Sequence, residues 1–411
     1  MPKLTPKRVF SVCRRSDLAF DQVIDRRAER GRQSPIGALL RLMVVAIACG
    51  HRKLRDVETL SEMMPPKMRR FIGLRGGGSS DTALYELLVR TPQLGFRQAL
   101  WQQVRTDLDR KTIQNDLFTH GVLSVDGKCA GWHKGQRPNA LCQRSFYGPT
   151  AEDAWRAFAL RACLTSSSAR PVLDQQFLTV DGEATAFGAM FERNVTKFPR
   201  LFRYVTADAG ITSAQNAQTV HAAGKHYLFA LKGNHRELVR LALDRLRDVG
   251  VDESYTEWYR GKLVRRELRR IGVPAHTGFA GAAQFVSVTT TRIDTTKTQR
   301  SPSRVFITSV PPDELSGRKL LTLVRLHWLI ENGANWTADT ILDEDTHCPC
   351  KTGWGMVVCS WLNLIAYNLL SVFRSRLPKR DGRPPAWRNV LRAIYHALLD
   401  WEPARAIAEN L

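Results

Sequence analysis

The sequence predicts an α/β protein in which a mixed sheet is flanked by helices, follows a helical region and contains a β-rich insertion. Two observations support this fold class. Hydrophobic residues recur with helical spacing over residues 1–115, and from residue 122 onwards short β-branched segments alternate with helical ones. Hydrophobic residues make up 43% of the 411 residues, so the chain is globular and long enough for two or three domains.

The charge balance points to a polyanionic partner. The chain has 61 Lys and Arg against 39 Asp and Glu, a formal net charge of +22. Nucleic acid is the leading candidate, although a ribosomal-type or merely soluble basic surface has the same balance. Residues 1–115 contain 22 Lys and Arg and 11 Asp and Glu, hence half of the excess. We therefore expect a DNA-binding region there.

Cysteine usage and hydropathy suggest a cytoplasmic protein. The eight cysteines form no CxxC pair, and free thiols explain Cys348-Pro-Cys350 better than a metal site does. The polar, basic start resembles no secretory signal. We find no apolar run of about 18 residues and expect no membrane span.

The first 115 residues are predicted to be helical. Ser34-Pro35 can start a helix over 36–49, which Gly50 ends. A second helix over 54–64 stops at Pro65-Pro66. Ser80 can cap a third over 82–90. A basic group of short helices of this kind can dock on a duplex.

From residue 122 the pattern becomes that of a mixed sheet covered by helices. The predicted strands cover residues 122–126, 156–164, 171–180, 203–207 and 226–231, and the predicted helices cover 183–194, 213–223 and 235–249. A β-rich insertion with strands at 265–273, 284–292 and 304–310 follows. Helices are expected from 313 to 339, over 353–373 and at the C-terminal end.

Three acids stand out against this pattern. Asp126 and Asp208 each end a predicted strand, and Glu331 lies on a predicted helix. Mg²⁺ prefers oxygen ligands, and two such ions can activate a nucleophile and stabilise the charge that develops at a phosphodiester. Each acid has an ordinary explanation as well, because Asp-Gly is common in turns and a helical Glu is most often solvated. The three together, in this order, favour a metal-dependent site.

Neighbouring polar residues are candidates for phosphate contacts. His327, Glu331 and Asn335 are spaced so that they lie along one helical face. His327 is as compatible with a buried core histidine as with a phosphate ligand. The remaining candidates follow the strand-end acids, where phosphate contact and plain solvation are equally compatible with the sequence: Lys128, Lys232 and Asn234.

The ordered motifs resemble the H-repeat-associated group of DDE insertion-sequence transposases, bacterial enzymes with a ribonuclease-H-like core. The matching segments are Leu123-Ser-Val-Asp126-Gly-Lys128, Val205-Thr-Ala-Asp208-Ala, Tyr227-Leu-Phe-Ala-Leu-Lys232-Gly-Asn234 and His327-Trp-Leu-Ile-Glu331-Asn332. The resemblance covers roughly residues 35–375. The chain departs from the group at His327 and Ala338, where related enzymes often carry Arg and Lys. A third acid from Asp339, Asp343 or Asp345 is a minor rival to Glu331.

The resemblance implies Asp126, Asp208 and Glu331 as catalytic residues and ligands of Mg²⁺, with Mn²⁺ as a substitute. It implies a DNA transposase that cleaves transposon ends and joins them to target DNA. The expected partners are double-stranded DNA with terminal inverted repeats, target DNA and a second copy of the chain. The expected location is the cytoplasm, in association with the bacterial nucleoid. The alternatives are a nuclease of the same fold and an inactive DNA-binding derivative.

The corresponding domain prediction has five parts. A helical, basic DNA-binding region covers 1–115. The catalytic core covers 116–249 and 313–375 and is interrupted by the β-rich insertion at 250–312. A helical tail covers 376–411.

Overall fold

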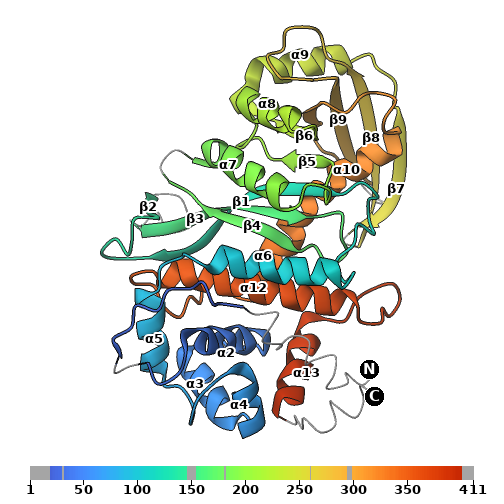
Figure 1. Ribbon diagram of the computed structural model, residues 1–411. Coiled ribbons are helices and arrows are strands. Elements are labelled where there is room, and N and C mark those ends of the chain that lie inside the picture. Colours follow the sequence, from blue (N-terminus) through green and yellow to red (C-terminus); the bar gives the residue numbers. More distant parts are fainter. Residues whose placement is uncertain are drawn as a thin grey trace.

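The computed structural model describes residues 19–29, 32–145, 154–179, 182–259, 261–293 and 299–399, so the outer ends of the predicted N-terminal region and C-terminal tail lie outside the described residues. One mixed sheet dominates, in the order β2-β3-β1-β5-β6-β11-β9-β8-β7, with β4 on β3 and β10 on β9 (Figure 1). Its strands are β1 (Val122–His133), β2 (Cys142–Ser145), β3 (Ala154–Leu164), β4 (Val172–Phe177), β5 (Tyr204–Ala207), β6 (His226–Leu231), β7 (Glu253–Tyr259), β8 (Lys262–Gly272), β9 (Gln284–Ile293), β10 (Gln299–Arg300) and β11 (Arg304–Thr308).

The parallel part of the sheet consists of β1, β5 and β6, and the other pairings are antiparallel. This arrangement, with helices on both faces, confirms the predicted ribonuclease-H-like α/β class. The predicted β-rich insertion is not a separate layer. Its strand β11 pairs with β6, and β9, β8 and β7 continue from there, so the insertion widens the central sheet. The sequence pattern did not identify β2 or β7.

Strand β1 is longer than predicted. It passes through Asp126 and continues to His133, because β3 pairs with it along that length. The prediction that the strand ends at Asp126 is therefore wrong. The neighbour on the other side, β5, pairs only with residues 122–125. Asp126 thus lies where β1 loses one of its two neighbours, which leaves space beside it.

The two faces of the sheet carry different helices. Alternate strand residues such as Leu123 and Val205 pack against the helices on one face, and Val122 and Tyr204 pack on the other. The first face is covered by α7 (Gly182–Lys197), α8 (Ala214–Ala222) and α9 (Arg236–Leu246), and the second by α10 (Gly317–Leu329) (Figure 1).

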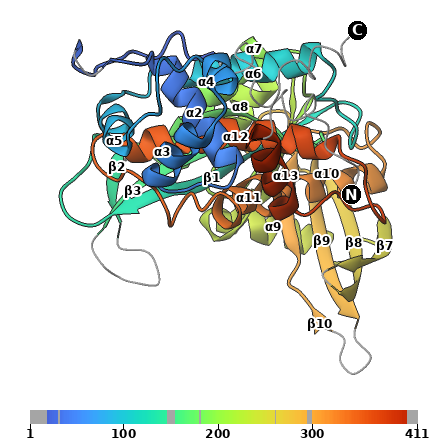
Figure 2. The same cartoon turned by 90° about the horizontal axis from the view of Figure 1, so that it is seen from below.

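The helical N-terminal region is packed onto the C-terminal part of the chain. Its helices are α2 (Ile36–Ala48), α3 (Leu54–Met63), α4 (Pro66–Ile72), α5 (Asp81–Arg90) and α6 (Phe96–Asp109). They share one hydrophobic core with α12 (Gly355–Ser375) and α13 (Trp387–Leu399) (Figures 1 and 2). The buried Gln103 side chain also donates to the Ile365 carbonyl oxygen at 3.1 Å. The predicted DNA-binding region is therefore anchored on the rest of the protein.

Helix α12 corrects the hydropathy analysis. The helix has 21 residues, and an 18-residue stretch of it has a mean hydropathy of 1.7, so by length and composition it could cross a membrane and the expectation that no such run exists is wrong. In the structure 94% of these 18 residues are buried inside the protein, and the helix lies between α6 and α2 (Figure 1). This burial is what the central helix of a folded core shows.

Candidate active site

The structure brings the three predicted acids to one region. Val125 of β1 pairs with Ala207 of β5, so the next residues lie side by side: Asp126 inside β1 and Asp208 just after the end of β5. Glu331 approaches from the helix that covers the second face of the sheet. Burial raises the pKa of Asp126, and the nearby charges of Glu331 and Asp208 raise it further. Burial also raises the pKa of Glu331, and the charge of Asp208 adds to that rise.

A π-helical turn carries Glu331. The helix predicted from 313 begins at Gly317, where the Ser316 side chain accepts from the Lys319 amide. It then widens into a π-helix over Ile330–Asn335 and continues as α11 (Trp336–Thr340). Such turns insert an extra residue into a helix and are frequent at functional sites. Here the turn gives Glu331 and Asn335 positions that a regular helix would not.

Asp126 is a mostly buried carboxylate with a raised pKa. Asn335 Nδ2 donates to its Oδ2 at 2.9 Å. Burial, followed by the charges of Glu331, Glu183 and Asp208, raises the pKa of Asp126 to about 7. Removing a charged carboxylate from water is costly, and three acidic neighbours add to that cost. Without a cation, Asp126 is therefore half protonated near neutral pH.

Asp208, unlike Asp126, has a lowered pKa. Burial favours its neutral form, but the hydrogen bond and charge of Lys232 and the Ala209 amide outweigh burial and lower the pKa. The Lys232 ammonium lies 2.8 Å from Oδ1 and 3.0 Å from Oδ2. The Ala209 amide donates to Oδ1 at 2.6 Å. Asp208 is thus charged at neutral pH, with an exposed lysine as its countercharge.

A pocket lies beside Asp208 and Glu331, between β6, β11 and α10. Basic and aromatic side chains line it, including Lys232, Arg304 and Trp328. The Arg304 guanidinium lies 4.5 Å from the centroid of the Trp328 ring. Burial and Asp208 raise the pKa of Glu331, and the charges of Arg304 and Lys232 partly offset that rise. Arg304 was not among the residues predicted from the sequence. Its only signal was a basic residue at the start of a strand.

His327 also lines this pocket, but it is a buried residue. Its side chain is 4% exposed, and Nδ1 lies 3.1 Å from the Thr206 hydroxyl. Burial lowers the pKa of His327 to about 4. The imidazole is therefore neutral at physiological pH and fits the core-histidine explanation better than that of a cationic phosphate ligand.

The remaining predicted phosphate contacts have other partners. Lys128 is buried, and its ammonium contacts Asp339 and lies 3.6 Å from Glu344. In this position it is not open to a phosphate. Asn234 Nδ2 donates to the Ala209 carbonyl oxygen at 2.7 Å and so holds the loop after Asp208. Asn335 supports Asp126, as described above.

The rival acids lie elsewhere. Asp339 pairs with Lys128, and Asp343 lies 4.0 Å from the Arg52 guanidinium. After burial, the charge of Glu331 is the largest influence that raises the pKa of Asp126. The geometry therefore favours Glu331 as the third acid.

The donor atoms suit a hard divalent cation. Like-charged carboxylates converge, and the buried Asn335 Oδ1 has no hydrogen-bond partner among the residues that the structure describes. Mg²⁺ and Mn²⁺ prefer such oxygen donors and keep several waters. Among the residues that the structure describes, no three His, Cys, Asp or Glu side chains are already arranged to hold a metal ion.

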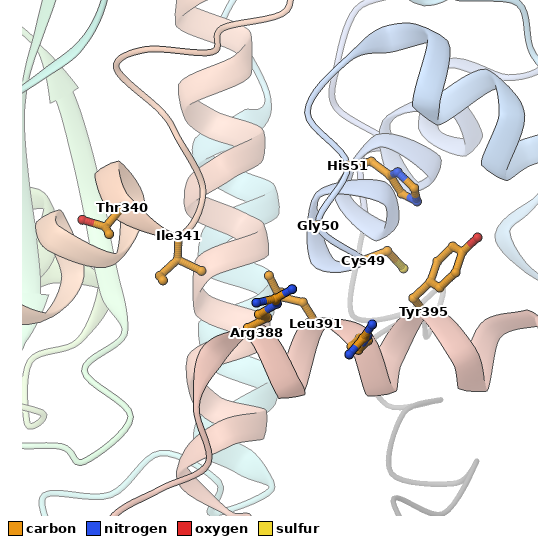
Figure 3. Close-up of a pocket in the computed structure, with 9 residues that line it drawn as sticks. Cys49, Gly50, His51, Thr340, Ile341, Arg388, Leu391 and Tyr395 are labelled. Carbon is orange, nitrogen blue, oxygen red and sulfur yellow. The ribbon is translucent and has the colours of Figure 1, made fainter.

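A second pocket lies away from the acids. Figure 3 shows Arg388, Leu391 and Tyr395 of α13 facing Cys49 and His51 at the end of α2. The rings of His51 and Tyr395 are 5.5 Å apart. The labelled side chains include no carboxylate, so this hollow is distinct from the site of the three acids.

The sheet topology and the acids on its neighbouring strands define a ribonuclease-H-like α/β protein. The model of the Transposase DDE domain family matches residues 117–369, which is more than half of the chain, and the chain belongs to that family. This membership confirms the resemblance found in the sequence.

Two proteins of Escherichia coli (strain K12) are similar to the chain. They are "Putative protein YbfL" and "H repeat-associated putative transposase YhhI". Each is 24% identical over 209 residues, which cover 47% of this chain and 54% of the relative. The chain thus spans about half the length of the curated relatives it matches.

Proposed function

We propose that the chain is a DNA transposase that cleaves transposon ends and joins them to target DNA. The observation that carries this proposal is the convergence of Asp126, Asp208 and Glu331 beside a pocket with two cationic side chains, Lys232 and Arg304. Membership of the Transposase DDE domain family supports the same activity. The net charge of +22 suits a DNA partner.

Asp126, Asp208 and Glu331 would hold Mg²⁺, with Mn²⁺ as a substitute. Such ions, when bound, lower the pKa of water and stabilise charge on the oxygens of a phosphodiester. Asn335 would keep Asp126 in position through its amide. Lys232 and Arg304 would contact phosphates that flank the scissile bond, and Trp328 would stack on an unpaired base.

The proposed reaction has two phosphoryl-transfer steps. In the first, water attacks a phosphorus atom at the transposon end, the P–O3′ bond breaks and a 3′-hydroxyl is released. In the second, this hydroxyl attacks a target phosphorus atom and displaces a target 3′-oxygen. We propose terminal inverted repeats and target DNA as the substrates, and a homodimer on DNA as the working form.

Strand joining is the step that tests this function. The assay supplies a pre-cut duplex from the DNA that flanks the coding region, a supercoiled target plasmid and Mg²⁺. We expect joined products with the wild-type chain and none with Asp126→Asn or Glu331→Gln, which preserve side-chain size. Cleavage without joining would favour a nuclease of the same fold. Binding without cleavage would favour an inactive derivative.

Asp343→Asn is the matched control for the third acid. Asp343 lies close to Glu331 in the sequence, and its φ of 53° is a left-handed conformation that Asn accepts. We expect this variant to retain joining. If Asp343→Asn abolished joining and Glu331→Gln preserved it, the assignment of the third acid would be wrong.

A further inference from the structure

A fourth carboxylate, Glu183, lies at the site of the three acids. It is in the first turn of α7, on the face of the sheet opposite α10. Burial raises the pKa of Asp126, and the charge of Glu183 adds to that rise. Burial, followed by the charge of Asp208, raises the pKa of Glu183. From the sequence, Glu183 was predicted only to begin a helix.

Two glycines provide the space for this carboxylate. A Cβ atom added to Gly127 would lie 1.8 Å from Glu183 Oε1, and one added to Gly210 would lie 2.8 Å from Oε2. Neither glycine has a positive φ. The backbone there is therefore open to other residues, and the restriction is one of space. Each of the two aspartates, Asp126 and Asp208, is followed within two residues by a glycine against which Glu183 packs.

The alternation of β1 explains how Glu183 reaches the acids. Ser124 and Asp126 face the α10 side, where the Ser124 hydroxyl accepts from Thr206, whose own hydroxyl lies next to His327. Gly127 faces the other side. Because it has no side chain and β5 has already ended, a carboxylate from α7 can extend past β1 toward Asp126. Glu183 and Glu331 thus approach from opposite faces.

The surroundings of Glu183 favour a cation. Within the described ranges, no hydrogen-bond donor or cationic side chain contacts its half-buried carboxylate. A second observation points to a ligand at the same place. Asn335 is 7% exposed and bonded to Asp126, and its Oδ1 is buried without a partner. An unpaired amide oxygen beside converging carboxylates is costly unless a cation or water binds it.

We propose that Glu183 is a fourth carboxylate ligand of this active site, binding a divalent cation held by Asp126 and Asp208 on the side opposite Glu331. This inference rests on the proposed function. With a second glutamate, the aspartates could help to hold two cations. These would stabilise the negative charge on the attacking oxygen and on the leaving oxygen at the scissile phosphate.

Mn²⁺ binding, measured without DNA from the electron paramagnetic resonance signal of the free ion, tests this role independently of activity. We expect Glu183→Gln to weaken Mn²⁺ binding at least about tenfold, because a charged oxygen ligand is lost. Glu192→Gln is the matched control, since Glu192 is an exposed residue of the same helix. Gly127→Ala, which places a methyl group where the Glu183 carboxylate lies, should weaken binding in the same way.

Glu183→Asp separates ligation from charge alone. It keeps the negative charge but shortens the reach, so we expect weakened binding. Thermal melting in EDTA verifies that each variant folds. If Glu183→Gln or Glu183→Asp binds Mn²⁺ as tightly as the wild type while Asp126→Asn does not bind it, Glu183 is not a ligand. The proposed function is then unaffected. Unchanged affinity in Asp126→Asn overturns the proposed metal site itself.

Discussion

Asp126→Asn should stabilise the metal-free protein, and more so at high pH. The pKa of Asp126 is about 7 in the folded chain, against an ordinary value of 3.8. At about 1.4 kcal/mol for each pH unit, ionising this group in the folded state costs about 4 kcal/mol at pH 8. Asn has the same shape, carries no charge and can still accept from Asn335.

The sign of the pH dependence follows from the raised pKa. Stability that depends on protonated Asp126 is fully present below pH 3.8 and is lost as the pH rises through about 7. The advantage of the variant should therefore be about 4 kcal/mol at pH 8 and below about 2 kcal/mol at pH 5. The change between the two pH values is decisive, because Asn does not titrate.

Urea denaturation in EDTA at pH 5 and pH 8 measures this difference. The same denaturation experiment with added Mg²⁺ is a second test. Mg²⁺ should stabilise the wild-type chain at pH 8 and have a much smaller effect on Asp126→Asn. An equal difference in stability between the two proteins at both pH values would refute the reasoning, because it would mean that burial and the neighbouring acids do not raise the pKa of Asp126.

Two further substitutions test the assignments around the site. Lys128→Met should destabilise the fold by about 3 kcal/mol in urea denaturation, because Glu344 loses one of its cations in a buried setting; Lys319→Met, on the exposed side of α10, should be nearly neutral. Arg304→Ala should make the logarithm of the DNA-binding affinity depend less steeply on the logarithm of the salt concentration, with the slope reduced by about 1, the value for one lost phosphate contact. A slope equal to that of the wild type would exclude Arg304 from the DNA interface.

Much of the catalytic core could be predicted from local sequence. Strand β6 was predicted with its observed bounds, and α8 within one residue at each end, because each has a clear period and a glycine or cap at its ends. The order of Asp126, Asp208 and Glu331, with their flanking motifs, was sufficient to indicate the family. These features depend on residues close together in the chain.

The tertiary structure alone decided which polar residues are available to substrate. Lys128 and Lys232 have similar sequence settings, yet Lys128 is buried against Asp339 and Glu344 and Lys232 is 64% exposed beside Asp208. Glu183 reaches Asp126 because β5 ends early and Gly127 has no side chain. The sequence determined the strands, the helices and the order of the acids, since these follow from local periodicity. Strand pairing and packing, which join residues far apart in the chain, determined which charges meet.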